Sequence, residues 1–397
     1  MCIEGSRQTR RRRAAERRRA IRTRRLGALG VAAALAFLVG IAIGGGRDES
    51  ERSAARSAPP PAPEEVARKE IEGPPGLPLS EQVGKLVVLR FAGTSAPGYV
   101  RRVLSQGRAA GAILFRDNLT GPEQAKRLAT GLQDTDDRRP LVMIDQEGGD
   151  IRIFPWAPPA ASQARQFAAG TVGADAEAAA KALRASGVDV TLAPVGDVAS
   201  VPGAAMAGRA FSTDFSDAAE ATAESVKGWR AGRVAPTVKH FPGLGGATTN
   251  TDFGSATIER SAQQIRDEDL VPFKAAIVAG VPLVMAGHAL YPALDSERIA
   301  SQSQPIIDGL LRDELGFEGV VITDSTEAKA VQEITPGVQE AALRNIRAGV
   351  DIVLTTGRGS YIQVYRALLA EAKRDPEFRA RVRQSAQRVV ALQQSLR

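Results

Sequence analysis

Short apolar segments rich in β-branched residues alternate with helix-forming segments through residues 77–397 of this chain. Eight candidate strands occur, at residues 85–91, 111–115, 141–145, 189–193, 234–239, 282–287, 319–323 and 351–355. Helix-forming stretches lie between most of them or close the chain, at residues 97–105, 122–133, 174–185, 217–231, 262–279, 305–315, 338–348 and 376–395. Repeated βα units imply a parallel sheet. The pattern therefore predicts the α/β class and a single (β/α)8 TIM-type barrel. A doubly wound open sheet is the alternative, but no Gly-x-Gly-x-x-Gly follows the first candidate strand.

The first 46 residues predict a membrane anchor. Residues 1–25 carry eleven arginines against two glutamates, and the 21 residues that follow, 26–46, carry no charge. About 20 apolar residues span a bilayer, and the positive-inside rule keeps the basic tail in the cytoplasm. We therefore expect a single-pass cell-membrane protein with an extracytoplasmic barrel. A cleaved signal peptide is one alternative. A nucleic-acid-binding arm is another, and the adjoining apolar segment argues against a nucleic-acid partner.

The remaining bulk properties say little about a ligand. The net charge is +7, but residues 1–25 alone balance to +9 (eleven arginines minus two glutamates), so the rest balances to −2. Cys2 is the only cysteine, which excludes an intrachain disulfide or a cysteine metal cluster. Residues 47–75 are rich in charge, Ala and Pro, as an extended linker is. The predicted organisation is a tail (1–25), a membrane helix (26–46), a linker (47–75) and a barrel (76–397).

Chemically active side chains occur where the predicted strands end. In a (β/α)8 barrel the functional residues gather at the carboxyl ends of the strands. Both histidines of the chain stand at such positions. The residues concerned are Asp145, Glu147, Asp197, Lys239, His240, His288 and Asp324. We therefore expect a polar site at one end of the barrel.

The carboxylates among these residues suit glycoside hydrolysis. Asp324 follows the apolar run V-V-I-T, so a buried strand would hold its carboxylate rigidly. The retaining route needs such a nucleophile and a second proton-transfer group. Each residue also has a structural interpretation. Asp324 would cap the next helix, Asp145 and Glu147 would form a salt bridge, Arg209 would lie on the surface, and His288 would be a hydrogen-bonded residue lining the site.

Metal and phosphate are two other classes of ligand that a barrel of this kind can bind. The two histidines lack the spacing typical of a metal site, so we expect no metal. The Gly-rich segment T-T-G-R-G-S at residues 355–360 keeps phosphate as a rival, because barrels often bind phosphate near their last strands.

Taken in order, these motifs resemble glycoside hydrolase family 3, and in particular its β-N-acetylglucosaminidase branch. The resemblance covers residues 79–392 and rests on G-A-I-L-F-R-D-N, I-D-Q-E-G-G, L-A-P-V-G-D-V, G-R-A-F-S, K-H-F-P-G, M-A-G-H-A-L-Y-P-A-L-D and V-V-I-T-D-S. It implies a retaining hydrolase that needs no cofactor and has Asp324 as nucleophile. The residues that it implies for sugar binding are Asp145, Arg209, Lys239 and His240. A β-linked N-acetylhexosamine of cell-wall glycan is the implied substrate, and peptidoglycan turnover the implied setting.

The chain departs from the family pattern where the proton-transfer group is expected. The branch usually has D-S-H a few residues after K-H-F-P-G-H-G, whereas here Leu244 follows K-H-F-P-G and the triplet is Asn250-Thr251-Asp252. The two arginines expected after D-Q-E-G-G are replaced by Asp150 and Ile153. Three hypotheses follow. Asp252 is the acid/base, with Asn250 hydrogen-bonded to it; the domain is a non-catalytic glycan-binding barrel; or the substrate specificity has changed.

Overall fold

The computed structural model describes residues 76–135 and 138–396. The predicted basic tail, membrane helix and linker lie outside the described residues. Within these two described ranges, no helix combines the length and the apolar character that crossing a bilayer requires.

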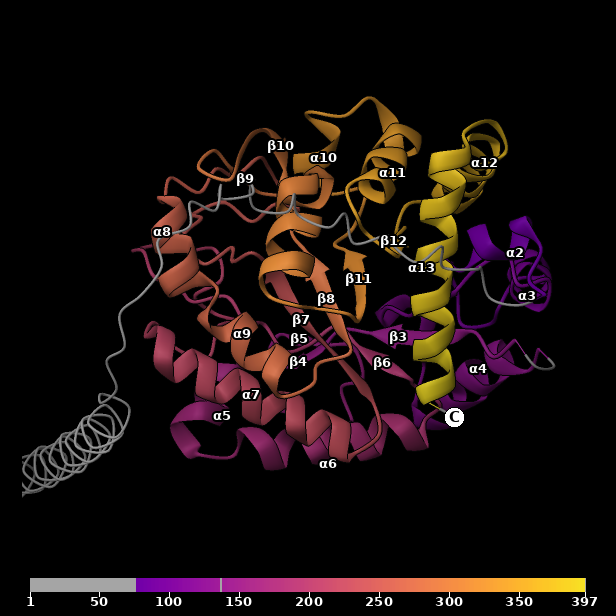
Figure 1. Cartoon of the computed structure of the whole chain (residues 1–397). Coiled ribbons are helices and arrows are strands. Elements are labelled where there is room, and N and C mark those ends of the chain that lie inside the picture. Colours follow the sequence, from indigo (N-terminus) through magenta and orange to yellow (C-terminus); the bar gives the residue numbers. More distant parts are fainter. Residues whose placement is uncertain (1–75, 136–137, 397) are drawn as a thin grey trace, which may run out of the picture. The chain divides into compact units, whose positions relative to one another are not determined.

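A nearly closed parallel barrel forms the centre of the described chain (Figure 1). Its strands are β1 (Val87–Leu89), β2 (Gly111–Ile113), β3 (Leu141–Ile144), β6 (Val190–Thr191), β7 (Ala235–Phe241), β8 (Leu283–Ala286), β11 (Val320–Thr323) and β12 (Val353–Leu354). They are ordered β11-β8-β7-β6-β3-β2-β1-β12. A parallel bridge between Ile322 and Ile352 brings the two end strands together. All eight predicted strands are confirmed, and β7 runs two residues past its predicted end at Lys239.

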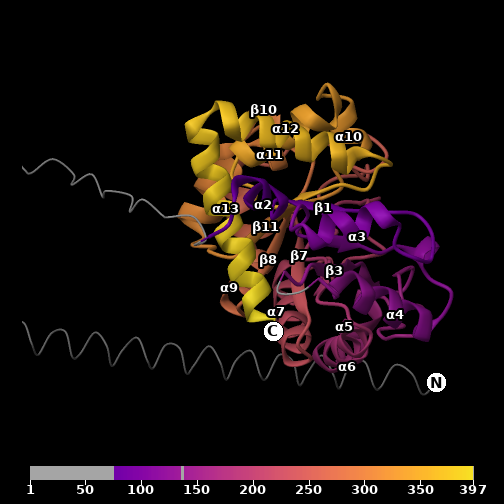
Figure 2. The same cartoon turned by 90° about the vertical axis from the view of Figure 1, so that its right-hand side faces the viewer.

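Helices surround the barrel and confirm the predicted alternation (Figures 1 and 2). They are α2 (Leu79–Gly84), α3 (Gly98–Ser105), α4 (Pro122–Gln133), α5 (Gln163–Ala169), α6 (Val172–Ala185), α7 (Phe215–Ala231), α8 (Ala262–Gln264), α9 (Val271–Val278), α10 (Lys329–Gln332), α11 (Gly337–Arg347), α12 (Ser360–Arg374) and α13 (Pro376–Ser395). Near the two ends of the described chain, α2 and α13 lie side by side (Figure 2). The sequence reasoning missed α2, α5, α10 and α12.

Two predicted helices differ from a regular α-helix. The segment predicted at 262–279 divides into α8, a π-helical turn η2 (Ile265–Asp269) and α9. Pro272 lies at the start of α9 and has no N–H to donate to the preceding turn, which accounts for the break. The segment predicted at 305–315 is π-helical over Pro305–Glu314.

The apolar core is divided between the inside and the outside of the barrel. Alternate strand residues point to opposite faces, so Val88 belongs to one cluster with strand residues such as Met143 and Ile322, while Val87 and Leu89 pack with residues of the outer helices. Val389 and Leu392 of α13 join the inner cluster. Two short hairpins were not predicted. They are β4 (Gln146–Gly148) with β5 (Ile151–Arg152), and β9 (Leu290–Tyr291) with β10 (Asp295–Ile299).

Candidate active site

Four charged side chains form an ion-paired cluster near the carboxyl ends of β3 and β7. Lys239 Nζ lies 2.7 Å from Asp145 Oδ1 and 2.7 Å from Glu147 Oε1. The Arg209 guanidinium holds the Glu147 carboxylate with two hydrogen bonds, of 2.9 Å from Nε and 2.7 Å from Nη2. The cluster thus unites three residues predicted for sugar binding with Glu147, which was outside that set.

The members of this cluster differ in their access to solvent. Only 2% of the Glu147 side chain is exposed, against 20% of Asp145. Burial alone would raise the pKa of Glu147, but the charges of Lys239 and Arg209 outweigh burial and lower it to about 2. Glu147 is therefore a fixed anion that orients the two cations. The structural interpretation of the acidic pair as a salt bridge holds for Glu147, whereas Asp145 keeps part of its carboxylate accessible.

His240 is oriented by a buried carboxylate and points its other ring nitrogen toward Asp324. Its Nδ1 lies 2.6 Å from Asp197 Oδ2, and its Nε2 lies 3.8 Å from Asp324 Oδ2. The second oxygen of Asp197 accepts the backbone N–H groups of His240, at 3.1 Å, and Leu244, at 2.7 Å. Asp197 therefore positions both the ring and the loop behind it. The sequence placed it at a strand end but gave it no role.

Asp324 follows β11 directly and faces the cations. Its backbone N–H donates to Ala286 O at 3.0 Å, and its carboxylate accepts the Ser325 N–H at 2.7 Å. Burial would raise the pKa of Asp324, but electrostatic interactions with His240, His288 and Lys239, together with the hydrogen bond from Ser325, outweigh burial and lower it. Asp324 is consequently ionised at neutral pH. The alternative of a helix cap is wrong, because the next helix begins only at Lys329 and has Ala328 as its N-cap.

Asp252 is held close to Asp324 by a loop that is fastened to the segment after β11. The carbonyl groups of Thr251 and Asp252 accept the N–H groups of Ala330, at 3.1 Å, and Lys329, at 3.2 Å. Asp252 is open to solvent, yet partial desolvation and the negative charge of Asp324 both raise its pKa. Asn250 was expected to hydrogen-bond the Asp252 carboxyl group. Instead, Asn250 Oδ1 accepts the backbone N–H of Asp252 at 3.0 Å.

His288 is hydrogen-bonded inside the site, as the sequence predicted. His288 is fully buried and hydrogen-bonded through both ring nitrogens, to Ser301 Oγ at 2.8 Å and Ser325 O at 3.0 Å.

In the segment considered for phosphate, the N–H and hydroxyl of Thr356 donate to the Glu327 carboxylate at 2.8 and 3.0 Å. A phosphate would have to displace that anion, so the segment is a poor phosphate site. Among the residues that the structure describes, no group of three or more His, Cys, Asp or Glu side chains is arranged to hold a metal.

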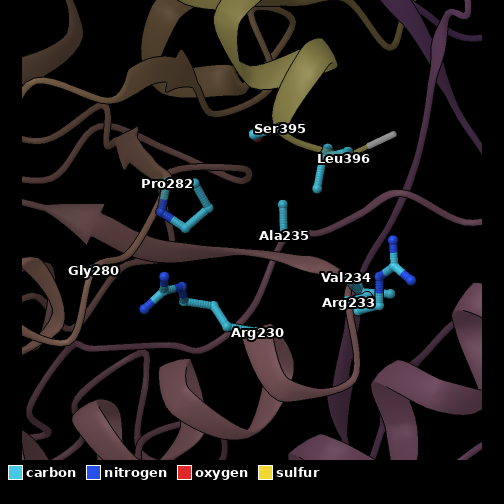
Figure 3. Close-up of a pocket in the computed structure, with 8 residues that line it drawn as sticks. All are labelled: Arg230, Arg233, Val234, Ala235, Gly280, Pro282, Ser395 and Leu396. Atoms are coloured by element: carbon cyan, nitrogen blue, oxygen red, sulfur yellow. The ribbon is translucent and has the colours of Figure 1, made fainter.

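A separate cavity lies at the opposite end of the barrel. Its volume is about 290 Å³, and its lining includes Arg230, Arg233, the first residue of β7, and Ser395 and Leu396 at the end of α13 (Figure 3). Arg230 Nη1 already donates to Ala279 O at 2.8 Å. None of the residues predicted for the active site lines this cavity.

A barrel with paired acidic and basic side chains at its carboxyl end suits a glycosyl hydrolase, and a family match gives that class. The family model described as "Glycosyl hydrolase family 3 N terminal domain" matches residues 78–392. The chain belongs to glycoside hydrolase family 3.

Relatives support the assignment along most of the barrel. A β-hexosaminidase of Stenotrophomonas maltophilia is 34% identical over 279 residues, covering 68% of this chain and 82% of that protein. The solved β-N-acetylhexosaminidase of Beutenbergia cavernae superposes with a TM-score of 0.73 at 32% identity, covering 80% of this chain and 99% of that one. A family 3 β-N-acetylglucosaminidase from Paenibacillus has a TM-score of 0.76 at 32% identity, covering 81% of this chain but 63% of that one.

Proposed function

We propose that this chain is a retaining β-N-acetylhexosaminidase in which Asp324 is the nucleophile and Asp252 the general acid/base. The supporting observation is that two neighbouring carboxyl groups have pKa values displaced in opposite directions, down for Asp324 and up for Asp252. A nucleophile has to be ionised, and a general acid has to carry a proton near the working pH. Opposite displacements of this kind support these two roles.

The step that we propose is a double displacement. Asp324 Oδ attacks the anomeric carbon while Asp252 gives its proton to the departing glycosidic oxygen, so that a glycosyl ester forms and the alcohol leaves. Asp252, now ionised, then takes a proton from water while the water oxygen attacks the anomeric carbon and displaces Asp324. Asn250 supports this exchange by fixing the backbone of Asp252, which leaves the carboxyl free to gain and lose its proton.

The ion-paired cluster would hold the sugar during both steps. Asp145 is partly exposed and can accept sugar hydroxyl groups, and Lys239, which it pairs with, Arg209 and His240 would supply hydrogen-bond donors. Because Glu147 and Asp197 already fix these donors, little side-chain freedom is lost when the sugar binds.

The proposed substrate is a β-linked N-acetylhexosamine at the end of a cell-wall glycan. The relatives named as β-hexosaminidase and β-N-acetylglucosaminidase support the sugar. The location is a further part of the proposal. It rests on the basic tail and the uncharged residues 26–46, which would anchor the barrel outside the cytoplasmic membrane. Protease accessibility of the barrel on intact cells tests that orientation, and protection of the barrel would contradict it.

Hydrolysis of a panel of p-nitrophenyl glycosides tests the activity. We expect turnover of the N-acetyl-β-glucosaminide, a burst of nitrophenol when hydrolysis of the ester is slow, and no turnover by Asp324→Ala. Azide should reactivate Asp252→Ala and yield a β-glycosyl azide, because azide needs no general base to attack the ester. If wild type and Asp324→Ala are equally inert on every sugar while still binding glycan, the chain is a glycan-binding barrel and the proposal fails.

A further inference from the structure

His288 lies one layer behind the proposed nucleophile, connected to it through a single residue. Its ring is fully buried, and its Nε2 lies 3.0 Å from the carbonyl oxygen of Ser325. The N–H of the same Ser325 donates to Asp324 Oδ1 at 2.7 Å. The two groups belong to adjacent peptide planes that share the Cα of Ser325, so a contact that fixes the carbonyl plane restricts how the plane carrying the N–H can turn.

The chemistry of the contacts fixes which ring nitrogen carries the proton. A carbonyl oxygen only accepts hydrogen bonds, so Nε2 must be the protonated nitrogen. Burial lowers the pKa of His288, which keeps the ring neutral. Nδ1 therefore has a free lone pair and accepts the hydroxyl proton of Ser301 at 2.8 Å. The proton order is Ser301 hydroxyl to Nδ1, and Nε2–H to the Ser325 carbonyl.

Both ends of this chain of hydrogen bonds are rigid. Ser301 is fully buried, and its N–H donates to Gly287 O at 3.0 Å, next to His288 itself. At the other end, Ser325 Oγ lies 2.6 Å from Thr356 Oγ1. Ser325 is thus held at its hydroxyl by the loop after β12 and at its carbonyl by His288 together with the N–H of Ala328, which donates at 3.0 Å. The remaining polar group of Ser325, its backbone N–H, donates to the carboxylate of Asp324.

We infer that His288, in its Nε2–H form and held by Ser301, is a positioning residue that aims the Ser325 N–H at the carboxylate of Asp324. This inference rests on the proposed function, because it takes Asp324 as the nucleophile. His288 touches no reacting atom under this inference. His288 thereby stabilises the negative charge of Asp324 and keeps the other carboxylate oxygen, Oδ2, in a fixed orientation.

The ionisation of Asp324 reports whether His288 has this role. The charged and titratable groups that face Asp324 are Lys239 and His240 from β7, Asp252 from the loop after β7, Arg209 from the loop before α7, and His288 after β8. Replacing His288 leaves Lys239, His240, Asp252 and Arg209 in place, removes the direct electrostatic effect of its ring on Asp324 and loosens the hydrogen bond from Ser325. A hydrogen bond to a charged group is strong enough to move a pKa by about one unit, and its loss should raise the pKa of Asp324 by that amount.

The first experiment follows the pH dependence of kcat/KM in full-length variants. His288→Leu should shift the acidic limb upward by about one pH unit and lower kcat about tenfold, with KM little changed. Gln places an amide N–H near the position of Nε2, so His288→Gln should return the limb toward wild type. Ser301→Ala should shift it in the same direction as His288→Leu but less. Ser303→Ala is the matched control, because it removes a buried hydroxyl two residues away that bonds Asp295 at 2.6 Å instead of His288.

The second experiment needs no catalytic activity. The chain has only two histidines, so selective ¹⁵N labelling gives two resolvable rings. We expect the Nε2–H tautomer at His288, persisting below pH 6.5 because burial lowers the pKa of the ring. His240 Nε2, at 3.8 Å from Asp324 Oδ2, should register the protonation of Asp324. That response should occur at higher pH in His288→Leu than in wild type.

The outcomes separate the two levels of the proposal. An inert wild type would refute the proposed function, and the ¹⁵N spectra would still judge His288. An Nδ1–H tautomer, or a His240 response that is identical in wild type and His288→Leu, overturns the inference. If the wild type is active, the inference is also overturned when the acidic limb of the kcat/KM profile lies at the same pH in His288→Leu as in wild type. If His288→Leu does not fold, Ser301→Ala against Ser303→Ala decides by the same two measurements.

Discussion

Buried carboxylates occur at both ends of the barrel, and their partners differ. At the amino end, Asp351 is fully buried and accepts from the Val321 N–H, Ser385 and three arginines, Arg312, Arg381 and Arg388, at 2.6 to 3.1 Å. At the carboxyl end, Asp324 accepts the Ser325 N–H, faces His240 only at 3.8 Å, and keeps 18% of its side chain exposed. The first carboxylate is saturated and joins elements together, whereas the second retains capacity for a ligand.

The difference shows what distinguishes a structural charge from a functional one in this fold. Asp189 repeats the amino-end pattern, with the Val142 N–H at 3.0 Å, Gln133 at 2.5 Å and Arg184 at 3.0 Å. Burial of a charge stabilises a protein only when its lone pairs are satisfied. A carboxylate that faces cationic groups without direct hydrogen bonds to them keeps lone pairs available for reaction, and the protein is less stable as a result. The comparison therefore predicts opposite consequences for substitutions at the two ends.

Asp324→Asn should give the largest effect on activity. Without a nucleophile the glycosyl ester does not form, and kcat/KM should fall by about a thousandfold or more. The thermal midpoint should stay within a few degrees of wild type, because a partly exposed carboxylate with one hydrogen bond is replaced by an isosteric amide. Paired kinetics and calorimetry check this prediction. A large loss of stability would place Asp324 with the structural carboxylates.

Asp351→Asn should show the reverse pattern. The substitution leaves three arginines around a neutral amide, and breaking a buried ion pair costs about 3–5 kcal/mol. Urea denaturation should show that loss, while kcat of the fraction that remains folded should match wild type. A variant of normal stability would show that the arginines find other acceptors and that Asp351 is not a structural centre.

Asp252→Asn should separate acid/base chemistry from the nucleophile. We expect kcat for a poor leaving group to fall by about a hundredfold or more. Because the pKa of Asp252 is raised by desolvation and by Asp324, wild-type activity should fall on the alkaline side as Asp252 loses its proton. The Asn variant should lack that alkaline limb, and Ser255→Ala, which only loosens the loop from Glu333, should keep it. An alkaline limb that survives in Asp252→Asn would assign the proton transfer to another group.

Asp269→Asn should give the smallest effect, confined to the pH dependence of stability. Asp269 is buried beside Gly243, and desolvation, opposed by Arg260, raises its pKa to about 7. The unfolded chain holds this proton less tightly, so the contribution of Asp269 to stability is full below about pH 4 and is lost as pH rises through about 7. The amide variant should lose less stability between pH 4 and 8 than wild type. Parallel curves of the thermal midpoint against pH would refute the assignment.

Residues with a fixed place along a strand could be predicted from the sequence. Lys239, His240 and Asp324 follow apolar runs directly, and the barrel topology brings such strand ends together. The ion pairing of Glu147 could have been predicted from the sequence. A second carboxylate two residues after Asp145, at a strand end otherwise rich in glycine, needs a cationic partner when it is buried. That His288 is hydrogen-bonded was predicted, but its partners could not be, because Ser301 lies in a turn after an unpredicted hairpin.

The sequence by itself determined the barrel, the end at which the site would form and the types of side chain available there, because strand periodicity and strand order are local and repetitive. It also determined the substitution of Asp252 for the expected histidine. Only the tertiary structure decided which carboxylates are saturated and which stay open. It fastened the Asp252 loop beside Asp324, gave Glu147 and Asp197 their orienting roles, and placed His288 behind Ser325. The reason is physical: the pKa and the reactivity of a carboxylate depend on burial and on charges from distant segments, which the residue's own sequence neighbours do not specify.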